Sequence, residues 1–208
     1  MGAQTVLENK DRLSREEART LVANEYERKF QLTWMEHLGF ENTYAPAVRS
    51  KAAATHHWKS ISDLKSGSKG LHAGFTFEFR ERQDGYPGLS KLYGFKFGKV
   101  SDMEPSLMYT ALRDGKVDVV SAFSTDGRIA AYDLAVLNDD QGFFPPYEAA
   151  IVVRDATLDK YPELKSDLRK LSGAISSESM RLMNLEVDQN HELPRNVAAK
   201  FLESLSKD

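Results

Sequence analysis

Short apolar segments alternate with short helix-forming segments along the middle of this chain, and this alternation restricts the fold more than any other feature. Residues 117–123 form a valine-rich run typical of a buried strand, and strands are also predicted over 71–77 and 95–100. Between them, 86–93 and 105–113 are predicted helices, each with a proline in its first turn. This order of elements predicts an α/β fold with mixed sheets.

The N-terminal and C-terminal regions add helices to this pattern. Ser14 and Glu17 have the spacing of a capping box, in which each side chain satisfies a backbone amide at a helix start. From Thr157 onward the chain is expected to be nearly all helix. The expected buried face of the first helix comprises Leu21, Val22, Tyr26 and Phe30. Further short strands are expected over 42–48, 134–137 and 149–153.

Composition excludes several classes of function. The formal net charge is -3 and no basic stripe dominates any segment, so nucleic acid is not an expected partner. Cysteine is absent, which removes disulfides, thiolate catalysis and zinc–thiolate sites. No apolar run reaches the ~20 residues of a membrane helix, and the start of the chain lacks the apolar core of a signal peptide.

Candidate catalytic and metal-binding groups are few. His56 and His57 are adjacent, and no third ligand follows at a metal-like spacing, so we expect a surface pair and no metal site. Asp139 and Asp140 are interpreted as solvated turn formers, because no nucleophile or oxyanion motif accompanies them. We therefore expect neither an enzyme nor a cofactor.

Two aromatic segments carry the strongest functional signal. Phe123 ends a predicted strand and is followed by Ser-Thr-Asp-Gly-Arg-Ile, and residues 142–147 read Gly-Phe-Phe-Pro-Pro-Tyr. In each segment an aromatic ring lies beside turn residues that direct it outward. Rings held in this way suit binding of a cation through cation–π attraction.

The same residues carry a family resemblance. The stretch FSTDGRIAAYDLAVLNDDQGFFPPYEAA resembles the substrate-binding proteins of bacterial ABC importers for glycine betaine, choline, carnitine and related quaternary amines. The resemblance implies a two-lobed periplasmic-binding-protein fold (type II, flytrap) in which two crossing strands join the lobes. By this resemblance, 1–43 and 148–208 form lobe 1, and 44–147 form lobe 2. Further matching motifs are FENTY at 40–44, RQDGYPGL at 82–89, YGF at 93–95, MYTAL at 108–112 and GKVDVV at 115–120.

Family members carry a further part of lobe 1 upstream, which ends in a Tyr-Thr-Gly-Thr-like turn with binding residues. Gly2 matches the glycine of that turn, and Ala3 stands where its second threonine would be. The resemblance therefore implies an incomplete first lobe. It also implies that this chain binds ligand more weakly than an intact relative.

The resemblance assigns an aromatic cage to three side chains. Tyr44, Phe123 and Tyr147 match cage aromatics, and Asn42 matches a position beside the cage. Two alternatives remain open from the residues alone. Tyr44 is also compatible with an ordinary half-buried strand tyrosine, and Phe123 with a core residue.

Polar side chains complete the expected site. Arg82 matches a family arginine that engages the carboxylate of betaine or carnitine, although a solvated surface arginine is the alternative. Ser124 and Thr125 are expected to add hydroxyl contacts, and turn capping is their alternative. Asp126 and Arg128 are expected to be structural, with Asp126 capping the next turn and Arg128 pairing across the hinge.

The implied function is capture of a quaternary amine for uptake and osmoprotection. The implied partners are the small-molecule ligand and an ABC permease subunit, with no insertion of this chain into the membrane, and the implied location is the outer face of a bacterial membrane. Two alternatives remain: a ligand-sensing regulatory module on the same fold, or a binder of another trimethylammonium compound such as ergothioneine.

Overall fold

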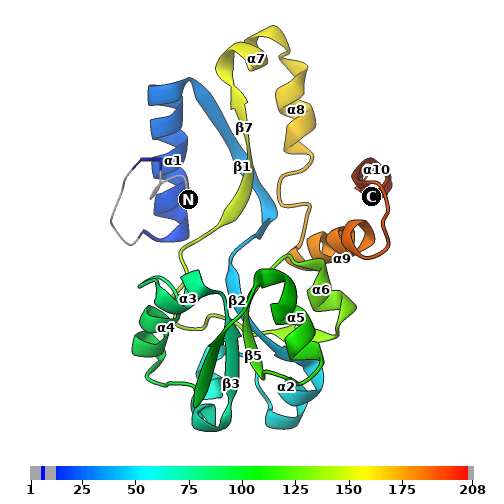
Figure 1. Ribbon diagram of the computed structural model, residues 1–208. Helices are drawn as coiled ribbons and strands as arrows, with labels where there is room; N and C mark the ends of the chain where they lie inside the picture. The colour runs from blue at the N-terminus through cyan, green and yellow to red at the C-terminus, as the bar shows by residue number, and fades with distance from the viewer. Residues whose placement is uncertain (1–5, 8–12, 206–208) are drawn as a thin grey trace. The chain divides into compact units, whose positions relative to one another are not determined.

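The computed structural model describes residues 6–7 and 13–205, and it divides into two compact units (Figure 1). Gly2 and Ala3 lie outside the described residues. Unit 1 comprises Met1–Asn42 and Pro145–Met180, and unit 2 comprises Thr43–Phe144 and Arg181–Asp208. The units divide near residues 43 and 145, close to the ends of the predicted lobes, whose assignment stays a prediction.

The last segment differs from the prediction, because residues 181–208 group with unit 2. Close backbone packing explains the difference. A Cβ added at Gly127 would lie 2.6 Å from the backbone nitrogen of Leu185. Asn184 Nδ2 also donates to the Thr125 carbonyl at 2.7 Å. A glycine at 127 thus lets this segment lie directly on unit 2.

Unit 1 begins with helix α1 (Arg15–Phe30). The predicted capping box is confirmed: Ser14 N donates to Glu17 Oε2 at 2.8 Å, and Glu17 N donates to Ser14 Oγ at 3.3 Å. Val22 and Tyr26 are buried as expected. The expectation for Phe30 is wrong, since it is 45% exposed, although its ring forms a T-shaped contact with that of Tyr26. Phe30 is the last residue of the helix, where the buried face ends.

An antiparallel pair of strands follows, formed by β1 (Leu32–Glu41) and β7 (Glu148–Arg154). The pairing runs from Leu32 opposite Arg154 to Glu41 opposite Glu148, with two register shifts between. Gly39 in β1 has φ +113°, and a Cβ there would lie 2.7 Å from the Ile175 carbonyl oxygen. The remaining helices of unit 1 are α7 (Asp155–Lys160) and α8 (Glu163–Arg169).

Unit 2 is built on a five-stranded mixed sheet with the order β4-β3-β5-β2-β6. Strand β3 is parallel to both β4 and β5, whereas β2 is antiparallel to β5 and β6. The mixed sheet agrees with the prediction. The strands are β2 (Tyr44–Arg49), β3 (His72–Phe75), β4 (Lys99–Asp102), β5 (Val119–Phe123) and β6 (Leu134–Val136).

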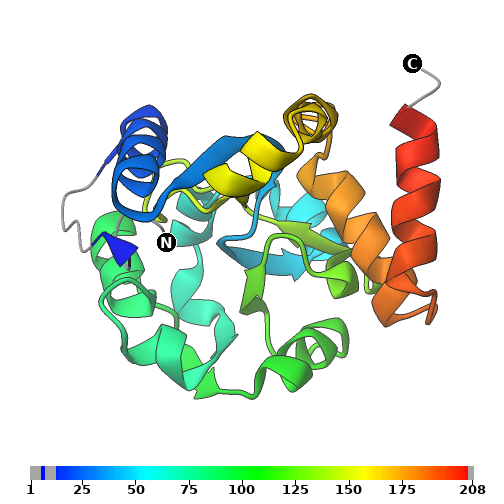
Figure 2. The same cartoon turned by 90° about the horizontal axis from the view of Figure 1, so that it is seen from above.

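Two helices of unit 2 have the bounds predicted from sequence, α4 (Tyr86–Tyr93) and α5 (Pro105–Arg113). The strand predicted over 95–100 is displaced, because β4 starts only at Lys99. The other helices are α2 (Ser50–His56), α3 (Phe77–Glu81) and α6 (Gly127–Ala131). The chain ends with α9 (Ser177–Asp188), which spans the boundary between the units, and α10 (Pro194–Leu205); Figure 2 shows the two side by side.

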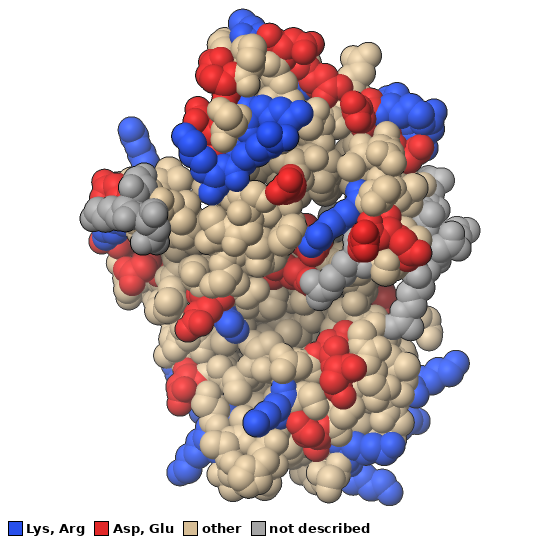
Figure 3. Space-filling view, turned by 180° about the vertical axis from the view of Figure 1, so that it is seen from behind, with Lys and Arg blue, Asp and Glu red and all other residues tan. Residues whose placement is uncertain are grey.

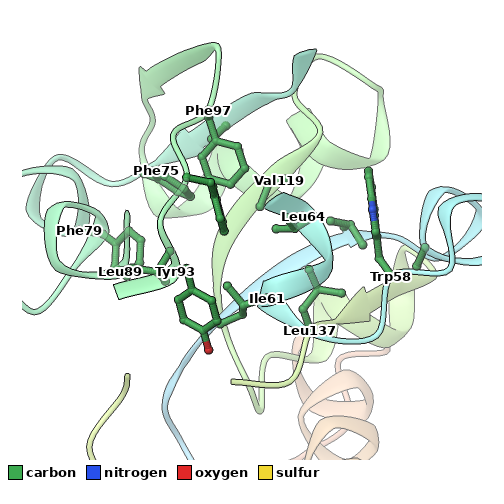
Figure 4. Close-up of a cluster of buried hydrophobic side chains, with 14 residues drawn as sticks. Trp58, Ile61, Leu64, Phe75, Phe79, Leu89, Tyr93, Phe97, Val119 and Leu137 are labelled. Carbon is green, nitrogen blue, oxygen red and sulfur yellow. The ribbon is translucent and has the colours of Figure 1, made fainter. Parts of the chain in front are cut away.

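Both faces of the sheet in unit 2 are covered. Val119 and Val120, adjacent in β5, are both fully buried but belong to different clusters. Since successive strand residues point to opposite faces, a cluster covers each side of the sheet. One cluster, drawn in Figure 4, is rich in aromatic rings, among them Phe75 of β3, Phe79 of α3 and Tyr93 of α4. The other contains Met108, Tyr109 and Leu112 of α5.

Pro46 sets the point along β2 at which pairing with β6 ends while pairing with β5 continues. It lies opposite Ser121 of β5, and its carbonyl accepts from Leu137 N at 2.9 Å. Proline has no N–H to donate in return. The pairing of β2 with β6 accordingly covers only Ala47 to Arg49. The Tyr44 end of β2 is therefore paired with β5 alone.

Charged side chains of both signs are distributed over the surface. On the face drawn in Figure 3, basic and acidic groups are interspersed with uncharged residues. This distribution agrees with the small net charge of -3.

The burial pattern of α5 makes a stability prediction. Leu112 is fully buried, whereas Leu107 on the same helix is 60% exposed. Leu112→Ala should lower the unfolding free energy by about 2–5 kcal/mol, because it leaves a cavity in a packed core. Leu107→Ala should change it by less than about 0.5 kcal/mol. Urea denaturation followed by far-UV circular dichroism measures both, and equal losses would contradict the assignment of the buried face.

Candidate functional site

Tyr44 and Phe123 meet where β2 and β5 pair. The two residues are directly opposite in the antiparallel register. Their ring centroids are 4.8 Å apart with an interplanar angle of 32°. Both side chains are half-buried. The two rings that the resemblance assigned to one cage therefore do lie in contact, and their role in binding stays a prediction.

Two further rings, which the sequence analysis did not include, join this pair. The Phe79 centroid lies 5.1 Å from that of Tyr44, and the Phe144 centroid lies 6.3 Å from those of Tyr44 and Phe79. We call Tyr44, Phe79, Phe123 and Phe144 the aromatic cluster. Phe79 is only 2% exposed and supports the cluster from the core, whereas Phe144 is half-buried. The sequence feature that could have identified Phe144 is the Gly-Phe-Phe-Pro-Pro-Tyr motif, which contains it.

The spacing of the rings limits how a cation can approach. A group held between two ring faces must keep about 3.5–4.0 Å from the atoms of each ring. Tyr44 and Phe123 are too close together to admit a group between them. They therefore act as one wall, which can attract a cation within about 6 Å of either centroid from its outer side.

Backbone hydrogen bonds hold this wall at the start of β2. Ser124 N donates to the Thr43 carbonyl at 2.9 Å, and Thr43 N donates to Ser124 Oγ at 3.1 Å. The Ser124 hydroxyl therefore accepts a hydrogen bond from the segment before β2, and its contact with a ligand stays a prediction. Thr125 is buried. The hydroxyl of Thr43 is buried and has no hydrogen-bond partner among the described residues, which makes it a further candidate polar group here.

Asp126 caps α6 as expected, accepting from Arg128 N at 2.9 Å. The expectation that Arg128 pairs across the hinge is wrong. Its guanidinium binds the Asp126 carboxylate at 2.7 Å and lies 4.0 Å from the centroid of the Tyr109 ring, all within unit 2. Burial alone would raise the pKa of the Asp126 carboxyl. The hydrogen bonds from the Arg128 side chain and backbone outweigh burial and hold that pKa below its ordinary value.

Arg82 follows α3 as its C-cap residue. Its Nε and Nη2 donate to the two oxygens of Asp84 at 2.7 and 2.5 Å, and its side chain is 65% exposed. The hydrogen bond from Arg82 lowers the pKa of the Asp84 carboxyl. Asp84 thus occupies the paired donors that the resemblance assigned to a ligand carboxylate. For Arg82 to bind a ligand carboxylate as predicted, its two hydrogen bonds to Asp84 must break.

Asn42 and Tyr147 belong to unit 1. Asn42 N donates to the Tyr147 carbonyl at 3.2 Å, next to the paired residues Glu41 and Glu148. The two segments predicted to cross between lobes are therefore neighbours at this point. The ligand contacts of the Asn42 and Tyr147 side chains stay predictions.

Among residues 6–7 and 13–205, no group of three or more His, Asp or Glu side chains is placed to hold a metal ion. Within the same ranges, no helix is both long enough and apolar enough to cross a membrane.

Comparison with known proteins gives consistent results. Residues 15–204 match the family described as the substrate binding domain of ABC-type glycine betaine transport systems. The carnitine transport binding protein OpuCC of Listeria monocytogenes is 41% identical over 189 residues, which cover 90% of this chain and 61% of that protein. The ergothioneine transport permease/ergothioneine binding protein EgtU of Helicobacter pylori (strain G27) is 39% identical over 88% of this chain and 33% of its own length.

Solved structures show the same relationship. The crystal structure of a glycine betaine/carnitine/choline ABC transporter protein superimposes with a TM-score of 0.93 at 40% identity, covering 97% of this chain and 74% of that one. Apo YehZ from Escherichia coli superimposes with a TM-score of 0.87 at 26% identity, covering 98% of this chain and 76% of that one. The two-lobed binding-protein fold is confirmed, and this chain spans about three quarters of each of these structures.

The Asp126–Arg128 pair predicts how stability depends on pH. Because folding depresses the pKa of Asp126, its contribution is present above the ordinary value of 3.8 and is lost as pH falls through the lower folded value. Asp126→Asn should therefore destabilise the protein at pH 7, and the difference from wild type should shrink below pH 3.8. Asp114→Asn, in an exposed pair with Arg113, should have a smaller effect at pH 7. Urea denaturation between pH 2.5 and 7 measures both variants, and a difference that stays constant over this range would contradict the assignment.

Proposed function

This chain belongs to the family of substrate-binding domains of ABC-type glycine betaine transport systems, and from that premise we propose that it captures a quaternary amine. The proposed ligands are glycine betaine, choline and carnitine, delivered to an ABC permease for uptake and osmoprotection. The proposed place of action is the outer face of a bacterial membrane. This role is binding and not catalysis.

The contact of Tyr44 with Phe123 carries the proposal. A quaternary ammonium group has no N–H to donate, so hydrogen bonds cannot select it. Aromatic faces attract it, with roughly 0.5–2 kcal/mol from each ring. The register that sets these residues opposite each other, and the hydrogen bonds between Thr43 and Ser124, fix the wall before any ligand arrives. A wall fixed in advance loses less conformational entropy on binding.

The remaining residues are assigned complementary roles. Tyr147 supplies a further ring, and Asn42 supplies a polar contact beside it. Arg82 receives the carboxylate of betaine or carnitine once Asp84 releases its paired donors. Ser124 and Thr125 contribute polar groups at the end of β5. Binding to both lobes would favour a closed state and present it to the permease.

A second ligand is favoured by one observation. The matched Helicobacter pylori protein is named for ergothioneine, and it is 39% identical to this chain over 184 residues. Ergothioneine also combines a trimethylammonium group with a carboxylate, so the same wall and the same arginine suit it. We propose it as the alternative to glycine betaine, choline and carnitine.

Calorimetric titration with these four compounds tests the proposal. One of them should bind saturably to the wild-type chain. Tyr44→Ala and Tyr147→Ala should each weaken that binding about 2- to 30-fold, the loss of one ring, whereas Tyr44→Phe should retain most of it.

Phe77→Ala is the matched control, because Phe77 is 66% exposed and takes no part in the aromatic cluster. It should bind as the wild type does. No binding of any of the four compounds by a folded wild-type sample, or equal binding by wild type and Tyr44→Ala, would overturn the proposal.

A further inference from the structure

The carboxylate of Asp139 organises the loop that carries Phe144. Tyr93 Oη donates to Asp139 Oδ1 at 2.5 Å. Phe143 N donates to Oδ1 and Phe144 N donates to Oδ2, both at 2.8 Å. The interpretation of Asp139 as a solvated turn former is therefore wrong, because three donors from two segments converge on it. A carboxylate is suited to this arrangement, since both of its oxygens are acceptors.

Tyr93 ties this loop to the core. It is the last residue of α4 and only 2% exposed. Figure 4 shows its ring among the buried side chains, with the hydroxyl directed away from them. The same hydroxyl accepts from Gln141 N at 3.0 Å. Burial, together with the hydrogen bond to Asp139, raises the pKa of the Tyr93 hydroxyl, which therefore stays protonated and able to donate.

The neighbouring side chains brace the same loop. Ser62 N donates to Asp140 Oδ1 at 3.2 Å, and Gln141 Nε2 donates to Ser62 Oγ at 3.2 Å. The Phe143 ring lies against α4, where a Cβ added at Gly88 would come within 3.0 Å of it. Because the Phe143 ring lies against α4, the ring that contacts Tyr44 and Phe79 is that of the next residue, Phe144.

We propose that Asp139 and Tyr93 are a positioning pair for Phe144, and that the Phe144 ring is a further aromatic contact for the quaternary ammonium group. The second half of this statement rests on the proposed function, and the first half does not. Phe144 ends the part of unit 2 that begins with Thr43. Its ring would extend the wall of Tyr44 and Phe123 beyond the two strands that form it.

The energetic argument concerns order in the free protein. A ring on an unconstrained loop would lose conformational freedom when it meets a ligand, which weakens binding. The hydrogen bonds from Phe143 N and Phe144 N to Asp139 fix the backbone that carries the ring beforehand, and Tyr93 fixes Asp139. An asparagine in place of Asp139 would present an N–H donor to one of the two backbone amides, so it should release either Phe143 N or Phe144 N.

The positioning pair is tested without any ligand. Amide hydrogen exchange of Phe143 and Phe144, measured by NMR, should be at least about tenfold faster in Asp139→Asn than in wild type, because an amide released from Asp139 loses protection. Tyr93→Phe should show a smaller increase at the same two amides. Asp114→Asn, whose carboxylate forms an exposed pair with Arg113 at the end of α5, is the control and should leave them unchanged. Wild-type exchange rates in Asp139→Asn would overturn the positioning role.

The ligand contact is tested with choline and its neutral isostere 3,3-dimethylbutan-1-ol. Phe144→Leu should weaken choline binding about 2- to 30-fold and should weaken binding of the isostere less, because only the cation is attracted to the ring quadrupole. Phe77→Leu is the control and should leave both affinities unchanged. Equal weakening of both compounds, or of neither, would overturn the contact.

A double-mutant cycle joins the two roles. Asp139→Asn alone should weaken choline binding, but in a Phe144→Leu background it should have little further effect, because its influence passes through the ring. Additive losses would overturn that link. If the wild-type chain is folded and binds none of the cations, the proposed function and the Phe144 contact both fail. The exchange measurements then still decide the positioning role.

Discussion

The antiparallel pairing of β2 with β5 is the constraint on which the aromatic cluster depends. Because side chains alternate along a strand, a shift of one residue would send Tyr44 or Phe123 to the opposite face. Several contacts hold the register. Tyr109 Oη accepts from Phe123 N at 3.0 Å, and Thr43 N donates to Ser124 Oγ next to the paired residues. Tyr109 is itself fully buried beneath the Arg128 guanidinium. The position of the rings is thus set by the core of unit 2.

Local signals in the sequence predicted the elements that local physics determines. The capping box at Ser14 begins α1, and the bounds of α4 and α5 agree with their proline starts and their glycine-containing ends. Apolar runs also predicted β5 and β7 within one or two residues. The family resemblance added what local patterns do not contain, namely that Tyr44 and Phe123 lie together, as their ring contact shows.

Contacts between distant segments account for what the sequence analysis missed. Strand β1 was not predicted. Its register is irregular, and the backbone at Gly39 lies too close to the Ile175 carbonyl for a Cβ to fit. Phe95 and Phe97 suggested a strand, yet they are buried outside the ladder, which starts at Lys99. The sequence predicts a solvated turn former at Asp139 and not its buried partner, because Tyr93 is distant in the sequence. Such pairings depend on the assembled fold and not on spacing.

The pairing of β1 with β7 gives the chain the connectivity of a hairpin, with Glu41 opposite Glu148. Where a hairpin has a short loop between its two strands, this chain has most of unit 2. Closing so long a loop from an unfolded chain carries a large entropic cost, and long-range pairing of this kind is slow. In folded unit 2 the two ends of this segment already meet, since Tyr44 and Phe144 are in ring contact. Once residues 43–144 are folded, the pairing of β1 with β7 closes across a short gap, and most of the loop-closure entropy has already been lost.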